Sequence, residues 1–152
     1  MRKLVEDTLK ALDPEIPFSE DAVNHVWGTG AHESAGWKYR KQMGNGPALG
    51  YFQVEPATFN DICNNFLKYK PKITAKIKLI CQVSALNSSD LYLNDRLAIC
   101  MCRVQYFRFK EPIPNTIEGY AKLWKLRYNT PLGKGTEKEF IENYHRYEEK
   151  PD

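Results

Sequence analysis

The sequence contains few cysteines and histidines, and none of them has the spacing of a metal site. The four cysteines are Cys63, Cys81, Cys100 and Cys102. No CxxC or HExxH motif occurs, and Cys100 and Cys102 would point in different directions on a helix. His25 and His32 would share a helical face, but no CxxC or HExxH motif lies nearby to complete a metal site. We therefore expect buried free thiols, no metal and no cofactor.

Long apolar segments are also lacking. The longest strongly apolar run, Leu97 to Cys102, is far too short to span a bilayer, which takes about 20 residues. The segment Met1 to Asp7 has no apolar core of the kind that a signal peptide requires. We therefore expect synthesis in a cytoplasm without an export signal, and we do not expect an integral membrane protein.

Acidic residues are missing between Asp61 and Asp90. Five lysines fall in that interval: Lys68, Lys70, Lys72, Lys76 and Lys78. Such a basic flank could hold an anionic polymer by attraction that salt weakens, or it could simply be a solvated helix face. No recognition motif accompanies the charge, so a specific nucleic-acid partner is not expected.

The chain of 152 residues has no linker, internal repeat or low-complexity segment, so one domain spanning residues 1–152 is expected. Apolar residues recur at helical spacing along most of it. The apolar set from Leu93 to Val104 predicts the longest and most buried helix. Residues 37 to 57 contain several glycines and prolines and predict a loop, with a small hairpin or extended segment at Leu49 to Val54. The fold class is mostly α with a small β element.

Helix boundaries follow from capping residues. Ser19 is expected to cap a helix that ends at Glu33. Thr58 is a candidate cap for the next helix, which Pro71 is expected to interrupt. Asn115 with Glu118, and Thr136 with Glu139, have the spacing of capping boxes.

Glu33 is the most informative single residue. It ends an amphipathic helical stretch that begins at Asp21, and Gly36 is a plausible stop signal after it. The negative end of the helix dipole and any apolar cover would both raise the pKa of Glu33. A carboxyl that stays protonated near neutral pH can act as a general acid. The alternative is an ordinary solvated glutamate at a helix end.

Three short motifs occur in order along the chain: Glu33-Ser34, a G-x-x-Q pattern from Gly50 to Gln53, and Tyr128-Asn129. In this order they resemble the lytic transglycosylases and goose-type lysozymes, particularly the small versions carried by bacteriophages. The resemblance implies a lysozyme-like α+β fold, a helical domain whose small β element flanks a glycan cleft. The sequence departs from the family pattern at Tyr51-Phe52 and at Thr130-Pro131.

The resemblance also implies roles for these residues. Glu33 would be the catalytic acid, Gly50 and Gln53 would line the sugar-binding groove, and Tyr128 and Asn129 would position the reacting sugar. The implied reaction is cleavage of the β-1,4 bond between N-acetylmuramic acid and N-acetylglucosamine in peptidoglycan. A lytic transglycosylase would form a 1,6-anhydro sugar without adding water.

Two further alternatives stay open. Goose-type lysozymes hydrolyse the same bond, which requires a second carboxylate, and Glu55 and Asp61 are the nearest candidates in the sequence. Both residues also have ordinary structural interpretations as residues at the start of a helix. The other alternative is a catalytically silent virion structural protein with this fold.

The remaining substrate-binding candidates are judged from their side chains. Tyr51 and Trp37 offer flat surfaces for sugar rings, and strand alternation places Tyr51 and Gln53 on one face and Phe52 in the core. Ser34 would either support Glu33 by a hydrogen bond or cap the helix end. Tyr128 is expected to face inward, and its structural alternative is a core tyrosine with a backbone partner.

The expected partner is the peptidoglycan glycan strand, which the protein would meet as a monomer. Because the sequence has no recognised export signal, delivery would depend on phage tail or virion proteins, or on a membrane-permeabilising holin. The enzyme would then act on the cell wall in the periplasm or be carried in the virion.

Overall fold

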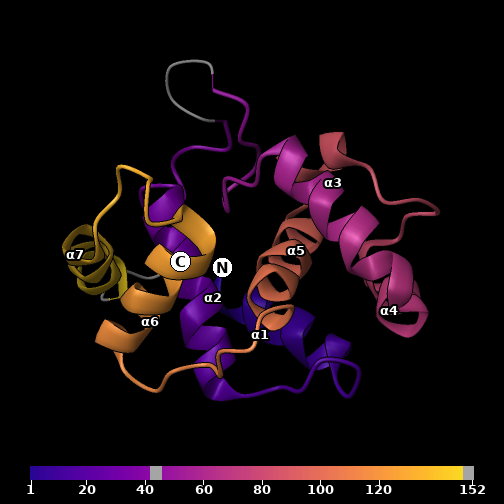
Figure 1. Ribbon diagram of the computed structural model, residues 1–152, viewed down its shortest axis with the longest axis horizontal. Helices are drawn as coiled ribbons and strands as arrows, with labels where there is room; N and C mark the ends of the chain where they lie inside the picture. The colour runs from indigo at the N-terminus through magenta and orange to yellow at the C-terminus, as the bar shows by residue number, and fades with distance from the viewer. Residues whose placement is uncertain (42–45, 149–152) are drawn as a thin grey trace.

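The computed structural model describes residues 1–41 and 46–148, and these residues are mainly helical (Figure 1). The α-helices are α1 (Arg2–Leu12), α2 (Glu20–Glu33), α3 (Pro56–Asn65), α4 (Pro71–Cys81), α5 (Asp95–Phe107), α6 (Ile117–Trp124) and α7 (Glu137–Glu148). Two 3-10 turns, Leu67–Tyr69 and Ser88–Tyr92, lie on either side of α4, and a π-helical turn, Lys125–Asn129, extends α6. No helix of the described residues is long and apolar enough to cross a membrane.

Helices α2 and α5 lie at the middle of the molecule, with α6 and α7 on one side and α3 and α4 on the other (Figure 1). Helix α2 packs against α1, α5, α6 and α7. Every residue of α5 from Leu97 to Tyr106 is buried, which confirms the prediction of a highly buried helix. The prediction that it is the longest helix is wrong, because α2 has 14 residues and α5 has 13.

The buried side chains form two apolar clusters that meet along α2. The larger cluster joins α1, α3, α4 and α5 to one face of α2. The smaller is mostly aromatic and combines Trp27 and Ala31 of α2 with Trp124 of α6 and Phe140 and Tyr144 of α7. The C-terminal end of α2 therefore lies where both clusters and the loop after the helix come together.

Several helix boundaries agree with the sequence. The Ser19 hydroxyl accepts a hydrogen bond from Ala22 N at 3.0 Å and caps α2. Pro71 begins α4, and Thr136 and Glu139 exchange the two hydrogen bonds of a capping box.

Two predicted caps are wrong. Thr58 lies inside α3, which begins at Pro56 because proline suits the first helical position. At α6 the capping residue is Thr116, whose hydroxyl accepts from Gly119 N at 3.0 Å, and not Asn115.

The predicted hairpin at Leu49 to Val54 is not seen in the described residues, although this segment is a loop as expected. Two isolated antiparallel bridges join Leu49 to Lys41 and to Val54. Between them, Gly50 and Gln53 have left-handed backbone angles, φ 77° and 52°, which close a tight turn. The chain therefore reverses at once and does not extend into paired strands.

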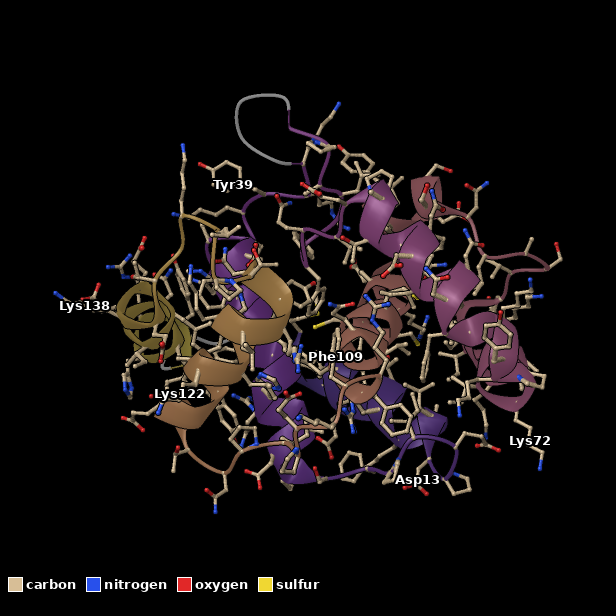
Figure 2. The ribbon with its side chains drawn as sticks, viewed as in Figure 1. Asp13, Tyr39, Lys72, Phe109, Lys122 and Lys138 are labelled. Atoms are coloured by element: carbon tan, nitrogen blue, oxygen red, sulfur yellow. The ribbon has the colours of Figure 1, made fainter. Side chains whose placement is uncertain are left out.

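The basic flank lies on the 3-10 turn Leu67–Tyr69 and on α4. Lys72 projects from α4 at the edge of the molecule, on the side opposite Lys122 and Lys138 (Figure 2). Lys76 makes an ion pair with Glu15 at 3.3 Å, so this lysine also stabilises the packing of α4. The flank thus includes both solvated and paired lysines.

Candidate active site

Glu33 is the last residue of α2 and lines a cavity of about 360 Å³. The helix ends there because the next residues leave the helical region: Ala35 and Gly36 have φ 52° and 73°, and Gly36 N donates to Ala31 O at 2.8 Å. The prediction that Gly36 helps to end this helix is confirmed by its left-handed backbone angle and by this hydrogen bond. The carboxyl group is held at the negative end of the helix dipole.

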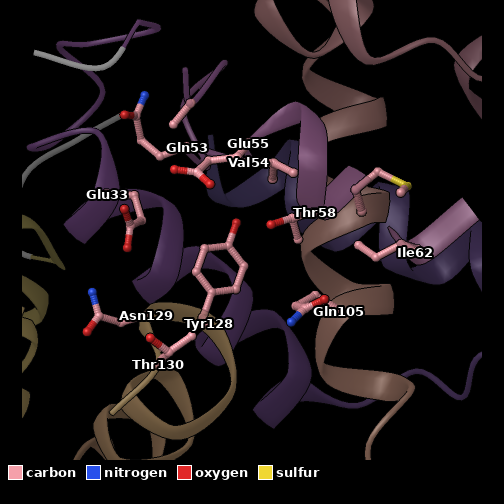
Figure 3. Close-up of a pocket in the computed structure, with 12 residues that line it drawn as sticks. Glu33, Gln53, Val54, Glu55, Thr58, Ile62, Gln105, Tyr128, Asn129 and Thr130 are labelled. Carbon is pink, nitrogen blue, oxygen red and sulfur yellow. The ribbon is translucent and has the colours of Figure 1, made fainter. Parts of the chain in front are cut away.

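The cavity is built from four parts of the chain: the end of α2, the loop and start of α3, the middle of α5, and the π-helical turn after α6. Its lining residues are Glu33, Ala48, Gln53, Val54, Glu55, Thr58, Ile62, Met101, Gln105, Tyr128, Asn129 and Thr130. Two of these residues carry carboxyl groups, and none of them is a lysine, an arginine or a histidine. The carboxyls of Glu33 and Glu55 and the hydroxyl of Tyr128 turn toward the same space (Figure 3).

Burial raises the pKa of Glu33 from an ordinary 4.5 to about 7. One interaction opposes this rise: the indole Nε1 of Trp124 donates a hydrogen bond to Glu33 Oε2 at 2.9 Å. The neighbouring His32 supplies no cation, because burial lowers its pKa to about 4. Glu33 therefore keeps its proton at pH values below about 7, where an ordinary glutamate has lost it, as a general acid requires.

The two candidate second carboxylates have different positions. Glu55 precedes α3, is exposed, and lines the same cavity as Glu33. Asp61 is outside the cavity lining and pairs with Arg108 at 2.7 Å and with Asn65 at 2.6 Å. This geometry places Glu55 on the same cavity as Glu33 and gives Asp61 a structural role in joining α3 to the end of α5.

The G-x-x-Q segment forms the turn at one edge of the cavity. Gln53 lines the cavity, but its Nε2 donates to Gly50 O at 2.9 Å, and its amide is turned away from Tyr128 (Figure 3). Gly50 does not line the cavity; a Cβ there would collide with the carbonyl oxygen of Leu91. The role of Gly50 is therefore to let the turn approach that backbone closely.

Tyr51 and Trp37 do not line this cavity, so their contact with sugar rings stays a prediction. Arg40 stacks on the Tyr51 ring at 4.0 Å while also pairing with Asp95 at 2.7 Å, and Trp37 packs against the other rings of the loop. Phe52 is completely buried, which confirms its predicted place in the core.

Ser34 caps the end of α2. Its hydroxyl donates to Gly30 O at 2.7 Å and accepts from Trp37 N at 2.7 Å, and the residue is fully buried. Both bonds use backbone partners, so the hydroxyl supports Glu33 only by fixing the helix end from which the acid projects.

Tyr128 and Asn129 both reach the cavity from the π-helical turn. The Tyr128 ring stacks on Tyr106 with centroids 5.4 Å apart, and its hydroxyl donates to Phe52 O at 2.5 Å. Burial raises the pKa of Tyr128 well above its ordinary value, so its hydroxyl keeps its proton. The three motifs, distant in the sequence, thus converge on one cavity.

A lysine shapes the loop after this turn. Lys125 Nζ donates to Asn129 Oδ1 at 2.8 Å, to Gly133 O at 2.7 Å and to Gly135 O at 2.6 Å. The loop is held by these bonds beside Thr130, which lines the cavity with a strained φ of 77°.

Two residues of the site lack a role in the sequence-based prediction. Gln105 of α5 donates to Arg127 O at 2.7 Å and lies on the cavity, one helical turn from Met101. A polar side chain within so buried a helix is the signal that could have identified it. Trp124 has no role in the sequence-based prediction, because its separation of 91 residues from Glu33 leaves no local signal of their bond.

Groups of three or more metal-binding side chains do not occur among the described residues. The four cysteines are free thiols, and three of them are buried. Comparison with protein-family models, with curated proteins and with solved structures found no match to this chain.

Proposed function

We propose that the protein is a peptidoglycan-degrading muramidase that cleaves the β-1,4 bond between N-acetylmuramic acid and N-acetylglucosamine with Glu33 as its acid. One observation carries the proposal: Glu33, with a pKa of about 7, lines a cavity that Gln53, Tyr128 and Asn129 also line. These are the residues to which the family resemblance assigns a common site. The resemblance supports the substrate, and the protonated carboxyl supports the chemistry.

The mechanism proposed is that of a lytic transglycosylase. Protonated Glu33 donates its proton to the bridging oxygen, and the C1–O bond of N-acetylmuramic acid breaks. The acetamido group of that sugar supports the cation, and the Glu33 carboxylate then removes the proton of the 6-hydroxyl. The 6-oxygen bonds to C1, which yields a 1,6-anhydro sugar and returns Glu33 to its protonated form.

Hydrolysis is the second candidate, and the position of Glu55 on the same cavity favours it specifically. Glu55 would act there as the general base for a water, as in an inverting glycosidase. The two reactions differ in their products, because a hydrolysed end carries one water more than an anhydro end.

Mass spectrometry of the muropeptides released from purified peptidoglycan tests the proposal. We expect wild-type protein to release 1,6-anhydro ends and Glu33→Gln to release nothing, while both are folded by circular dichroism. Hydrated ends would instead show that the protein is a hydrolase and not a transglycosylase. If folded wild-type protein releases no fragments, a silent virion structural protein becomes the better account.

Delivery to the wall is also part of the proposal. Expression in a bacterial cytoplasm should be tolerated until chloroform or a co-expressed holin breaches the membrane, and lysis should follow. Lysis without a breach would show that the protein reaches the wall by another route. Tight co-purification with virions would favour delivery by a phage tail.

A further inference from the structure

We propose that Trp124 is a positioning residue for Glu33, and that its indole N–H fixes which carboxyl oxygen carries the acid proton. The catalytic consequence rests on the proposed function, but the arrangement itself does not. An indole nitrogen can only donate, so Glu33 Oε2 must be the acceptor in the 2.9 Å bond. In a neutral carboxyl the carbonyl oxygen is the better acceptor, and the proton therefore belongs on Oε1.

The direction of the bond suits a proton donor. Glu33 lines the cavity whereas Trp124 does not, so the indole reaches the carboxyl from the protein side. Oε1 is left as the oxygen that can deliver a proton to a ligand. Without the indole, the carboxyl could rotate and direct its proton elsewhere, and catalysis would lose the orientation that general acids need.

The indole is itself held firmly. Trp124 is almost completely buried, its ring packs on Phe140 with centroids 5.4 Å apart, and His32 meets it edge-on at 4.6 Å. A Cβ on Gly135 would lie 2.6 Å from the indole, so the loop after the π-helical turn closes tightly over it. Three elements, α2, α7 and this loop, thus lock the orientation of the donor.

The other buried titratable groups around Glu33 stay neutral near pH 7. From α5 these are Cys102 and Tyr106, and from the π-helical turn Tyr128; burial raises the pKa of each. His32, next along α2, is neutral because burial lowers its pKa to about 4. Across the cavity, Glu55 is the remaining carboxyl that faces Glu33. Only Trp124 opposes the rise in the Glu33 pKa by a hydrogen bond.

The direct test is nuclear magnetic resonance of the indole N–H groups in ¹⁵N-labelled wild-type protein. We expect the Trp124 signal to shift with pH around a midpoint near 7, and to lose that titration in Glu33→Gln but keep it in Glu55→Gln. This readout needs no activity, so it stands even if peptidoglycan is not cleaved. A Trp124 signal that does not titrate in the wild type would overturn the proposal.

The kinetic test uses Trp124→Phe, which keeps an aromatic ring and removes the N–H. We expect at least a tenfold lower kcat with little change in KM, and an alkaline limb of the pH–activity profile about one unit higher, because the lost bond favoured the carboxylate. Trp27→Phe is the matched control, since Trp27 is also almost completely buried but its Nε1 has no hydrogen-bond partner among the residues that the structure describes. If the two variants have the same kinetic constants and the same pH–activity profile, Trp124 contributes to packing and does not position Glu33.

Discussion

The Tyr128 hydroxyl donates a hydrogen bond to the carbonyl oxygen of Phe52 at 2.5 Å, and this bond joins two walls of the cavity. One wall is the π-helical turn after α6, and the other is the tight turn of the G-x-x-Q segment. A backbone partner is what the core-tyrosine interpretation of Tyr128 requires. The residue therefore combines a structural bond with a place on the cavity.

Tyr128→Phe should lower stability more than it lowers turnover. The ring can still stack on Tyr106, but Phe52 O loses its donor, at a cost of about 1 kcal/mol, or roughly 2 to 4 °C in Tm. Thermal unfolding and muramidase kinetics on the same preparation measure both effects. Tyr69→Phe, at an exposed ring, is the control. An unchanged Tm with a large loss of kcat would instead assign the hydroxyl to the reaction.

Glu33→Gln should become more stable relative to wild type as pH rises. Below pH 4.5 the wild-type carboxyl is protonated in both folded and unfolded states and has no effect. Between pH 4.5 and about pH 7 the carboxyl loses its proton in the unfolded state but keeps it in the folded state. The free energy of unfolding of the wild type therefore falls as pH rises, by about 3 kcal/mol in all. Above that range the difference is constant.

Denaturant unfolding of both proteins from pH 4 to pH 8 checks this prediction. Asp61→Asn is a suitable control, because the bond from Arg108 keeps the pKa of Asp61 below its ordinary value and so outside this window. A difference between Glu33→Gln and wild type that stays flat with pH would show that the carboxyl is not buried as a neutral acid.

Glu55→Gln should retain activity within about tenfold of wild type if the substrate's own 6-hydroxyl is the nucleophile. Loss of a general base ordinarily costs a factor of about 10² to 10⁴. Initial rates on purified peptidoglycan measure the effect, with Asp61→Asn as the partner variant away from the cavity. A loss of a hundredfold or more in Glu55→Gln alone, together with hydrated product ends, would favour the hydrolase.

Gly50→Ala should destabilise the protein by about 1 to 3 kcal/mol. The left-handed φ of 77° strains any L side chain, and the new Cβ would press on the Leu91 carbonyl oxygen. Thermal unfolding measures the loss. An unchanged Tm would show that the turn can accommodate a Cβ at this position. A direct role for Gly50 in glycan binding would then be the better explanation.

The parts of the site that follow local rules could be predicted from the sequence. Glu33 ends its helix as expected because hydrogen bonds between residues close in the sequence determine both helix boundaries. Ser19 caps the start of α2, and Gly36 bonds back to the helix at its end. The burial of Phe52 was also predicted correctly. Each of the three motifs contributes at least one residue to the cavity, namely Glu33, Gln53 and Tyr128 with Asn129, whereas Gly50 does not line it. The roles of these residues are still predictions.

The remaining errors come from interactions that cross the molecule. Strand alternation placed Tyr51 and Gln53 on one face, but the segment forms a turn, and Arg40 together with the distant Asp95 holds Tyr51 outside the lining of the cavity that Gln53 reaches. Trp124 approaches Glu33 only because α6 and α7 pack beside α2. No periodicity within a single segment contains that information.

The three bonds from Lys125 have a consequence for ligand recognition. A surface loop usually has to be ordered when it meets a ligand, and that loss of conformational freedom weakens binding. Here one ammonium group already holds the oxygens of Asn129, Gly133 and Gly135, so the wall beside Thr130 keeps its shape in the free protein. Any ligand that touches this wall meets a surface whose conformational freedom was already lost during folding, so more of the contact energy appears as binding affinity.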